Sequence, residues 1–381
     1  MTRAVLLSVL LLAGCRQDAQ SQRPAPQTVA TAAEAGDAVG QSRRTAVTRA
    51  VETVTPAVVS VNVIEVRQVR VRDPWAGDPF FEQFFGRRPD QVYQQQVQGV
   101  GSGFVISPDG YIVTNDHVAG NATRITVAFP DGTQLPATLV GTDPETDVAL
   151  IKVDPEGDLP YLAFEDEEDA IVGEWAIAIG NPFGLFEAAE PSVTVGVVSA
   201  VGRDFPAQEG HVYRDMIQTD AAINSGNSGG PLVNALGRVI GMNTFIYSNT
   251  GGTVGLGFAV PSWRIDRVVE ELRASGTVDR AFYTGLNVRP INERVARALG
   301  LPEARGLVVA SVDDGSPAAA AGLRPYDVVV AIEGQPVQTN DDVRARLLDA
   351  RAGDTVGLTV VREGATVEVR LRLARSGGVN G

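Results

Sequence analysis

A serine crowded by glycines is the stretch of the sequence with the clearest chemical potential. Residues 224–232 read Asn-Ser-Gly-Asn-Ser-Gly-Gly-Pro-Leu, which places Ser228 among three glycines. Glycine tolerates the φ angles that aim backbone N–H groups at one point, and such a point can hold an oxyanion. Acyl transfer needs a nucleophilic oxygen beside two such donors. The pattern predicts Ser228 as a nucleophile and the N–H groups of Gly226 and Ser228 as an oxyanion hole, with Asn227 ordering the loop.

A serine hydroxyl is a weak nucleophile at neutral pH, so this interpretation requires a base. The chain contains two histidines. His117 follows the apolar run at 111–113, where a strand would fix its ring, whereas His211 lies in a polar stretch and is predicted to be a solvated loop residue. Asp147 opens the apolar run that follows it and is the predicted orienting carboxylate. The predicted catalytic residues are therefore His117, Asp147 and Ser228, in that order.

Two other carboxylates stay open as partners for His117. Asp143 precedes a proline in a predicted turn. Asp116 adjoins the histidine, and on an alternating strand its side chain would face the opposite side. We therefore prefer Asp147.

The order of these residues separates two fold classes. The spacing Gly226-x-Ser228-x-Gly230 also fits the nucleophile elbow of α/β-hydrolases, but in those enzymes the histidine follows the serine. No histidine follows Ser228. The order histidine, aspartate, serine is that of the chymotrypsin-type double β-barrel.

Three linked motifs carry a resemblance to a known family. Thr-Asn-Asp-His-Val at 114–118, Thr-Asp-Val-Ala-Leu at 146–150 and Gly-Asn-Ser-Gly-Gly at 226–230, followed by a further domain, resemble the HtrA (Deg) family of envelope serine proteases. The resemblance covers most of the chain after about residue 46. It implies a serine endopeptidase of the periplasm that needs no cofactor, acts on unfolded or misfolded polypeptides, and assembles as a homotrimer or a larger unit.

The resemblance also assigns a substrate pocket. Ile223, Phe245 and Ile246 match the positions that line the primary specificity pocket in this family. An apolar wall rejects charged side chains, because burying an unpaired charge is costly, so cleavage is expected after small or medium aliphatic residues. The alternative is that Ile223 belongs to the hydrophobic core.

Composition limits the classes of function. A net charge of −14 and 44% hydrophobic residues indicate a folded acidic protein and argue against nucleic-acid binding, which needs clustered Lys and Arg. A single cysteine excludes an internal disulfide framework. With two histidines no zinc-type cluster is expected. At 381 residues, two or three domains are expected.

The N-terminus has the pattern of an export signal. A short basic start and an apolar run to residue 12 end in Leu-Ala-Gly-Cys at 12–15, which resembles the lipobox of bacterial lipoproteins. Cys15 would then become a lipidated first residue that anchors the protein to a membrane. The alternative is an ordinary secretory signal with an incidental cysteine. Residues 16–45 are polar and poor in large apolar side chains, and are predicted to be a disordered tether.

Short β-branched runs separated by turn residues predict a mainly β protease domain over residues 46–275. The residues predict one barrel from 58–64, 103–106, 111–114, 124–129, 135–140 and 148–153, and a second from 175–179, 192–201, 216–219, 231–234, 239–244 and 255–260. An insertion at 72–98 carries four phenylalanines at 78–86, for which an oligomer or regulatory contact and packing on the barrel are both open. The acidic run at 165–169 is expected to be a solvated connection, and the segments 181–191 and 203–214 are, by resemblance, loops that order on activation.

A helix joins this domain to the last one. It is predicted from Ser262, as N-cap, to Gly276. Residues 280–374 are predicted as mixed β structure with two short helices, at 316–322 and 340–350, and resemble a PDZ domain of the HtrA type. Such domains add a peptide as an extra strand and bind its terminal carboxylate. The resemblance places the carboxylate loop at Tyr283, Thr284, Gly285 and Leu286, where the polar Thr284 leaves the peptide preference open.

Three functions follow from these features. Degradation of misfolded envelope proteins, regulated by peptides at the PDZ domain, is the broadest expectation. A stress-sensing protease that cuts one signalling protein would also have an anchor and a single PDZ domain. A holdase chaperone without catalysis is disfavoured, because its triad would ordinarily be damaged and this one is intact.

Overall fold

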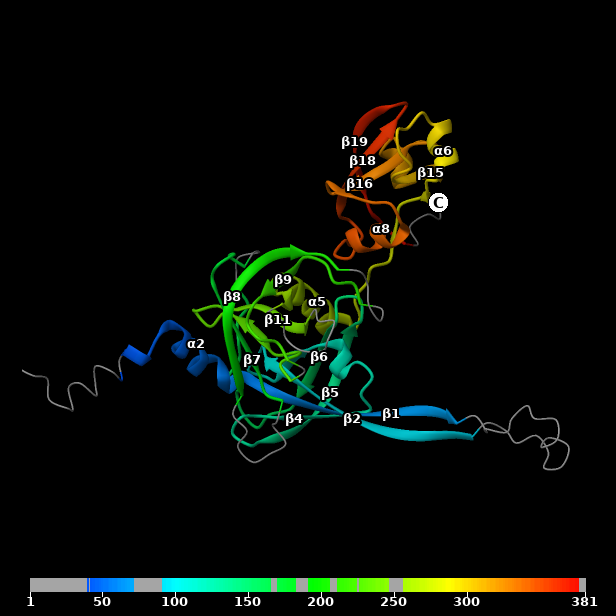
Figure 1. The fold of residues 1–381 in the computed structure, drawn as a ribbon. Helices are drawn as coiled ribbons and strands as arrows, with labels where there is room; N and C mark the ends of the chain where they lie inside the picture. The colour runs from blue at the N-terminus through cyan, green and yellow to red at the C-terminus, as the bar shows by residue number, and fades with distance from the viewer. Residues whose placement is uncertain are drawn as a thin grey trace, which may run out of the picture. The chain divides into compact units, whose positions relative to one another are not determined.

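Two closed six-stranded β-barrels and a smaller α+β domain follow one another along the chain (Figure 1). The structure is a computed structural model. It describes residues 40, 42–71, 91–165, 170–182, 191–205, 211–224, 226–246 and 256–376. The predicted signal segment with Cys15 and most of the predicted tether lie outside these residues, as does the phenylalanine-rich segment 78–86.

The first barrel is closed by antiparallel pairing in the order β1-β2-β3-β6-β5-β4. Its strands are β1 (Val58–Val71), β2 (Gln91–Val105), β3 (Tyr111–Thr114), β4 (Arg124–Ala128), β5 (Gln134–Asp143) and β6 (Val148–Val153). Their inward residues, such as Ile112, Leu150 and Ile151, are fully buried. The β-branched runs therefore form strands because each fills this barrel's interior.

β1 and β2 continue past the barrel as a two-stranded ribbon, visible in Figure 1. Their register runs without interruption from Val58 paired with Phe104 to Val71 paired with Gln91. The predicted insertion at 72–98 was therefore wrong at its C-terminal end, since residues 91–98 belong to β2. These residues are rich in glutamine and lack the apolar pattern of a core strand, because they pair along a ribbon outside the barrel.

The second barrel repeats the closure in the order β10-β11-β12-β9-β8-β7. Its strands are β7 (Trp175–Gly180), β8 (Ser192–Arg203), β9 (Met216–Thr219), β10 (Pro231–Val233), β11 (Val239–Ile246) and β12 (Gly257–Pro261). One apolar cluster spans both barrels, joining Val59 and Phe104 of the first to Ile177 and Met242 of the second. The predicted double barrel is confirmed.

Two helices pack on the barrels. α2 (Ala46–Val54), continued by the 3-10 turn η1 (Thr55–Ala57), was not predicted; the Thr45 hydroxyl caps it, and Ala50 and Val54 are buried. α5 (Ser262–Ser275) buries four apolar residues at helical spacing: Ile265, Val268, Val269 and Leu272. It ends, as predicted, at Gly276, whose φ of +74° suits glycine. Ser262 is not its N-cap: it is the first helical residue, and Pro261 holds the cap position without a side-chain bond.

Among the described residues, the last domain has a six-stranded antiparallel sheet, a two-stranded pair of β13 with β20, and three short helices. The sheet order is β14-β15-β16-β18-β19, and β17 pairs with β16. The elements are β13 (Phe282–Tyr283), β14 (Leu286–Pro290), α6 (Glu293–Ala298), β15 (Leu307–Val312), α7 (Pro317–Ala320), β16 (Val328–Ile332), β17 (Gln335–Pro336), α8 (Asn340–Arg346), β18 (Thr355–Arg362), β19 (Ala365–Arg372) and β20 (Ala374–Arg375). Ser316 caps α7 as predicted. The two-helix prediction missed α6, and α8 ends at Arg346 rather than at residue 350.

In the part of the chain that the structure describes, no helix has both the length and the apolar character needed to cross a membrane.

Candidate active site

His117 lies on a one-turn helix, α4 (Asp116–Ala119), directly after β3. Its backbone N–H donates to Asp147 Oδ1 at 3.0 Å. Its ring Nδ1 lies 2.9 Å from Oδ1 and 2.8 Å from Oδ2 of the same carboxylate. Asp147 therefore fixes both the position of the helix turn and the plane of the imidazole, and it leaves Nε2 facing away from the carboxylate.

Asp147 is held in an uncommon backbone conformation. It lies in the turn between β5 and β6 with φ at +59°, a left-handed value that costs energy in any residue other than glycine. Its side chain is fully buried. The Asn115 amide donates to the Asp147 carbonyl at 3.0 Å and to the Thr244 hydroxyl at 3.2 Å, so the turn is tied to the second barrel. Such a conformation persists only where its surroundings hold it.

The two alternative carboxylates have other partners. Asp143 receives two hydrogen bonds from Arg280, both at 2.6 Å, and one from the Thr146 hydroxyl. Asp116 is bonded by Thr142, and burial, with the charge of Asp147, raises the pKa of Asp116. The expected strand at Asp116 was wrong because residues 116–119 form a helix. Among the three carboxylates, only Asp147 has a hydrogen bond to the His117 ring.

The loop that carries Ser228 belongs to the second barrel, and hydrogen bonds from Ser102 of the first barrel hold it in place. Ser102 of β2 accepts from Asn181 N–H at 2.7 Å, donates from its hydroxyl to the Gly226 carbonyl at 2.6 Å, and donates its N–H to the Ser228 carbonyl at 2.8 Å. At Gly229, with φ at +83°, a Cβ would come within 2.2 Å of the Ser102 oxygen. Glycine is required there because the two barrels meet backbone to backbone.

The backbone donors of this loop divide into two groups. The N–H groups of Asn227, Gly229 and Gly230 each donate a hydrogen bond of 2.9 Å to a backbone carbonyl of the turn or of β11. Those of Gly226 and Ser228 make no hydrogen bond to another described residue. The Asn227 side chain donates to the Ala222 carbonyl at 3.2 Å and so braces the loop. The two N–H groups predicted as an oxyanion hole are thus the two that remain available.

A cleft of about 340 Å³ runs past both catalytic candidates. Its walls include His117 and Ser228 together with the base of the β1–β2 ribbon and the residues after α4. The Ser228 hydroxyl, 9% exposed as a residue, donates to the Thr244 carbonyl at 3.0 Å. A substrate in this cleft would therefore lie against both His117 and Ser228.

The predicted specificity residues are only partly visible. Ile223 is 1% exposed and packs in the second barrel's own cluster, beside Ala221 and opposite Gly257. Phe245 and Ile246 lie on β11, where they pair with Phe258 and Gly257, but their side chains lie outside the described part. The burial of Ile223 is compatible with both the pocket and the core interpretation.

His211 was predicted to be solvated, and this prediction was wrong. It is 8% exposed, and its ring lies 6.5 Å from the His117 ring and 6.0 Å from the Tyr213 ring, measured between centroids. Its Nδ1 lies 2.5 Å from the Pro144 carbonyl. The polar residues next to His211 in the sequence do not indicate its burial, because it is buried by contact with the turn that carries Asp147.

The last domain contains an apolar groove of about 430 Å³ between β14 and α8. Thr284, Leu286 and Val288 line one side, and Val343 and Leu347 line the other. Among the described strands, β14 lies at the edge of its sheet and pairs with β15 alone. Of the predicted carboxylate loop, Thr284 and Leu286 reach the groove, whereas the Tyr283 hydroxyl bonds Asp313 at 2.7 Å, which raises the pKa of Tyr283.

Gly285 shapes the loop at the end of this groove. Its φ is +68°, and a Cβ would come within 2.1 Å of the Ser316 Cβ. The carbonyls on either side of this turn are also used: Thr284 accepts from Ala318 N–H at 3.0 Å, and Gly285 accepts from Asp313 N–H at 2.9 Å. The loop is therefore held by hydrogen bonds and by close packing on Ser316.

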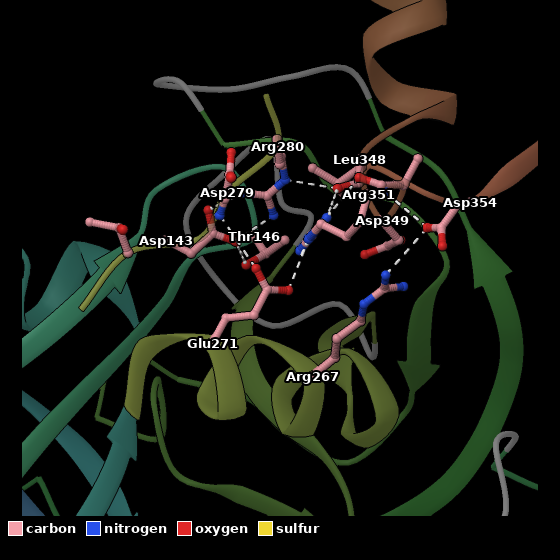
Figure 2. A network of polar contacts seen from close by, with 12 residues as sticks. Asp143, Thr146, Arg267, Glu271, Asp279, Arg280, Leu348, Asp349, Arg351 and Asp354 are labelled. Atoms are coloured by element: carbon pink, nitrogen blue, oxygen red, sulfur yellow. Dashed lines mark hydrogen bonds and ion pairs between the residues drawn. The ribbon is translucent and has the colours of Figure 1, made fainter. Parts of the chain in front are cut away.

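Polar contacts connect this domain to the turn that carries Asp147. Figure 2 shows Arg280 between Asp143 and the Leu348 carbonyl, which accepts at 2.8 Å. Arg344 of α8 pairs with Glu145 at 2.5 Å, and Glu145 and Arg280 themselves line the apolar groove. Nearby, Arg264, 2% exposed, donates to both carboxylate oxygens of Asp349, at 2.9 and 2.6 Å.

No group of three or more His, Cys, Asp or Glu side chains is placed to hold a metal ion within the described ranges.

Comparisons with known proteins agree with this arrangement. The family model described as a trypsin-like peptidase domain matches residues 101–242, and that of the PDZ domain matches residues 284–373. A probable periplasmic serine endoprotease, DegP-like, from Chlamydia trachomatis is 46% identical over 297 residues, which cover 77% of this chain and 58% of that protein. Its counterpart from Brucella suis is 40% identical over 354 residues, covering 85% and 67%. The chain thus spans about three fifths of the length of the first curated relatives that it matches.

Solved structures of HtrA-type proteases also resemble this chain. The HtrA-type protease AlgW with decapeptide has a TM-score of 0.60 and 37% identity, and the match covers 86% of this chain and 98% of that one. A serine endoprotease from Yersinia pestis has a TM-score of 0.53 and 30% identity, with 86% and 97% covered.

Proposed function

This chain belongs to the family of HtrA-type serine proteases, and from that premise we propose that it hydrolyses peptide bonds with Ser228 as nucleophile. The observation that carries the proposal is the contact of both Asp147 carboxylate oxygens with His117 Nδ1 beside a cleft that also exposes Ser228. With Nδ1 held by Asp147, the imidazole can act through Nε2 as the general base that a serine nucleophile requires.

The reaction follows from these positions. His117 Nε2 accepts the Ser228 hydroxyl proton while Oγ forms a bond to the peptide carbonyl carbon, and the N–H groups of Gly226 and Ser228 stabilise the oxyanion. The imidazolium, held by Asp147, then gives the proton to the leaving amine as the C–N bond breaks. Water, activated by His117, hydrolyses the ester. Before attack, the hydroxyl must leave the Thr244 carbonyl that it bonds in the resting structure.

We propose that the groove between β14 and α8 binds the C-terminus of a polypeptide as an added strand. The free edge of β14 supplies backbone partners, and Leu286, Val343 and Leu347 supply an apolar wall for the last side chain. The carboxylate would lie at the loop of Tyr283, Thr284, Gly285 and Leu286. Support comes from the fixed turn at Gly285, where backbone N–H groups can converge.

Peptide binding in that groove is proposed to regulate proteolysis. Arg280 and Glu145 belong both to the groove and to the contacts on the Asp143–Asp147 turn. A peptide that displaces or tightens these side chains would change how firmly the turn is held. The coupling is then a physical contact rather than a long chain of packed residues.

The substrate class, location and assembly are proposals of the same kind. The relatives named above are periplasmic, and we propose that this protein degrades misfolded or damaged polypeptides there. Unfolded chains expose apolar segments and termini, which an apolar groove and a pocket containing Ile223, Phe245 and Ile246 would accept. The Leu-Ala-Gly-Cys segment supports a lipid anchor at Cys15. Assembly as a homotrimer or larger unit rests on the family resemblance.

The proposal is tested with purified residues 46–381 and the Ser228→Ala variant on unfolded casein, with and without a peptide that ends in a hydrophobic residue and a free carboxylate. We expect cleavage by the parent, none by the variant, and a change in the parent's rate when the peptide is present. Equal casein turnover by both proteins would overturn the role of Ser228. Suppression of casein aggregation without cleavage would instead identify a holdase.

A further inference from the structure

His211 is one of only two histidines in the chain, and the other is the candidate base. Its Nδ1 lies 2.5 Å from the Pro144 carbonyl oxygen. A carbonyl oxygen can only accept, so Nδ1 carries the proton and donates it. The residue is 8% exposed, and its ring centroid lies 6.5 Å from that of His117 and 6.0 Å from that of Tyr213.

The residue after it makes a parallel contact. Val212 N–H donates to the Glu145 carbonyl at 2.7 Å. Two consecutive residues of one segment therefore hold two consecutive carbonyls of the turn that leads to Asp147. Val212 is also packed against Ala345 and Leu348 of the last domain, so this segment is itself supported.

The turn needs such support because of its geometry. Asp147 has a φ of +59°, and its two carboxylate oxygens must reach the same His117 nitrogen. Strained conformations relax when their surroundings stop holding them. A small rotation of Asp147 would remove one of these contacts and tilt the imidazole, and displacements of about 1 Å at a catalytic group can cost about a hundredfold in rate.

We propose that His211 is a positioning residue of the catalytic triad: its Nδ1–H holds the Pro144 carbonyl and thereby keeps Asp147 aligned with His117. The inference rests on the proposed protease function. His211 is not a second base, because its Nδ1 proton is engaged by a carbonyl and it does not line the cleft that exposes Ser228. Its effect passes through Asp147.

Two substitutions separate this role from simple packing. His211→Asn places an amide nitrogen the same number of bonds from Cα as Nδ1, so it can still donate to Pro144. His211→Gln places the amide nitrogen one bond farther, at the distance of Nε2, and loses that contact. Both remove the ring, and both introduce a neutral amide of similar polarity.

Peptide hydrolysis by the two variants is measured with a fluorogenic substrate. We expect His211→Gln to lower kcat by about 10- to 100-fold with KM changed by less than about twofold, because the alignment of His117 with Asp147 is lost while the cleft is intact. We expect His211→Asn to restore kcat to within about threefold of the parent. Equal kcat in all three proteins, or an equal loss in both variants, would overturn the proposal.

A second readout does not depend on turnover. In the Ser228→Ala background with ¹⁵N-labelled histidine, each variant contains a single histidine, so its low-field Nδ1–H proton signal reports the His117–Asp147 hydrogen bond. We expect that signal to match the parent's in His211→Asn and to shift or broaden in His211→Gln. An unchanged signal in His211→Gln would contradict the positioning role. If the parent cleaves nothing, the protease proposal fails, while this spectrum still decides the role of His211.

Discussion

The ion pair between Arg280 and Asp143 is where a single substitution should affect both domains. Asp143 has a side chain 3% exposed, and Arg280 one 16% exposed. Arg280 makes two hydrogen bonds of 2.6 Å to the carboxylate and a third, of 2.8 Å, to the Leu348 carbonyl. Burial alone would lower the pKa of Arg280, but the hydrogen bonds to Asp143 and the charge of Asp143 raise it, so the guanidinium stays charged.

Arg280→Met would leave the Asp143 carboxylate buried with only the Thr146 hydroxyl as a side-chain partner. Breaking a buried pair from one side typically costs about 3–5 kcal/mol, chiefly because of the charge left behind. Adding Asp143→Asn removes that charge, so the double variant should lose less than the sum of the two single losses, with a coupling of about 2 kcal/mol. Activity should also fall, since the Asp147 turn loses a support.

The assay is guanidinium unfolding followed by tryptophan fluorescence. All three tryptophans, at positions 75, 175 and 263, precede the last domain, so the signal reports the protease domain. Arg267→Met is the matched control, because its pair with Asp354 is longer, at 3.4 Å, and exposed by 39% and 46%. That variant should lose less than about 1 kcal/mol. An Arg280→Met loss no larger than the control's, or additive losses in the double variant, would show that the buried pair of Arg280 and Asp143 does not stabilise the protein as expected.

Two further predictions concern the peptide groove and pH. Gly285→Ala should weaken binding of a C-terminal peptide by more than about tenfold, measured by fluorescence anisotropy, because its Cβ would meet Ser316 at 2.1 Å in a left-handed turn; unchanged affinity would contradict the assigned loop. Burial alone would raise the pKa of Asp204. Hydrogen bonds from the Asp215 N–H, Arg214 and Arg346 outweigh this effect and lower the pKa of Asp204 below its ordinary value of 3.8. A carboxyl group whose pKa is lower in the folded state than in the unfolded state stabilises the fold. This contribution is fully present at pH values above the unfolded-state pKa and is lost as the pH falls through the folded-state pKa. The parent should therefore be more stable than Asp204→Asn at pH 5 to 7 and lose this advantage below about pH 4; a constant difference down to pH 2 would contradict the contacts.

The sequence was sufficient for the features that depend on local pattern. Short β-branched runs bounded by turn residues located the strands of both barrels except for the ribbon parts of β1 and β2, and β3, β6 and β9 have the predicted bounds. The order of His117, Asp147 and Ser228 selected the fold, since only one of the two candidate architectures has that order. Gly276 ended its helix as predicted because a left-handed cap is almost always glycine.

What the sequence missed depends on contacts between distant segments. His211 looked solvated because its burial comes from the turn at Pro144, 67 residues away in sequence. The sequence does not reveal the helix at Asp116, because a single helical turn has too few residues to show a helical hydrophobic period. The fastening of the Ser228 loop by Ser102 joins two barrels and has no local signature. Likewise, nothing near Arg280 in sequence indicates that its partner is Asp143, 137 residues away.

Covalent labelling of Ser228 tests whether this residue is the activated nucleophile. The protein is incubated with a fluorophosphonate, which reacts with an activated serine, and the modified residue is located by mass spectrometry of the digested chain. We expect a single adduct on Ser228 that disappears in Ser228→Ala and forms at least about a hundredfold more slowly in His117→Ala and Asp147→Asn. Labelling of another serine, or labelling of Ser228 at the parent's rate in both His117→Ala and Asp147→Asn, would contradict it.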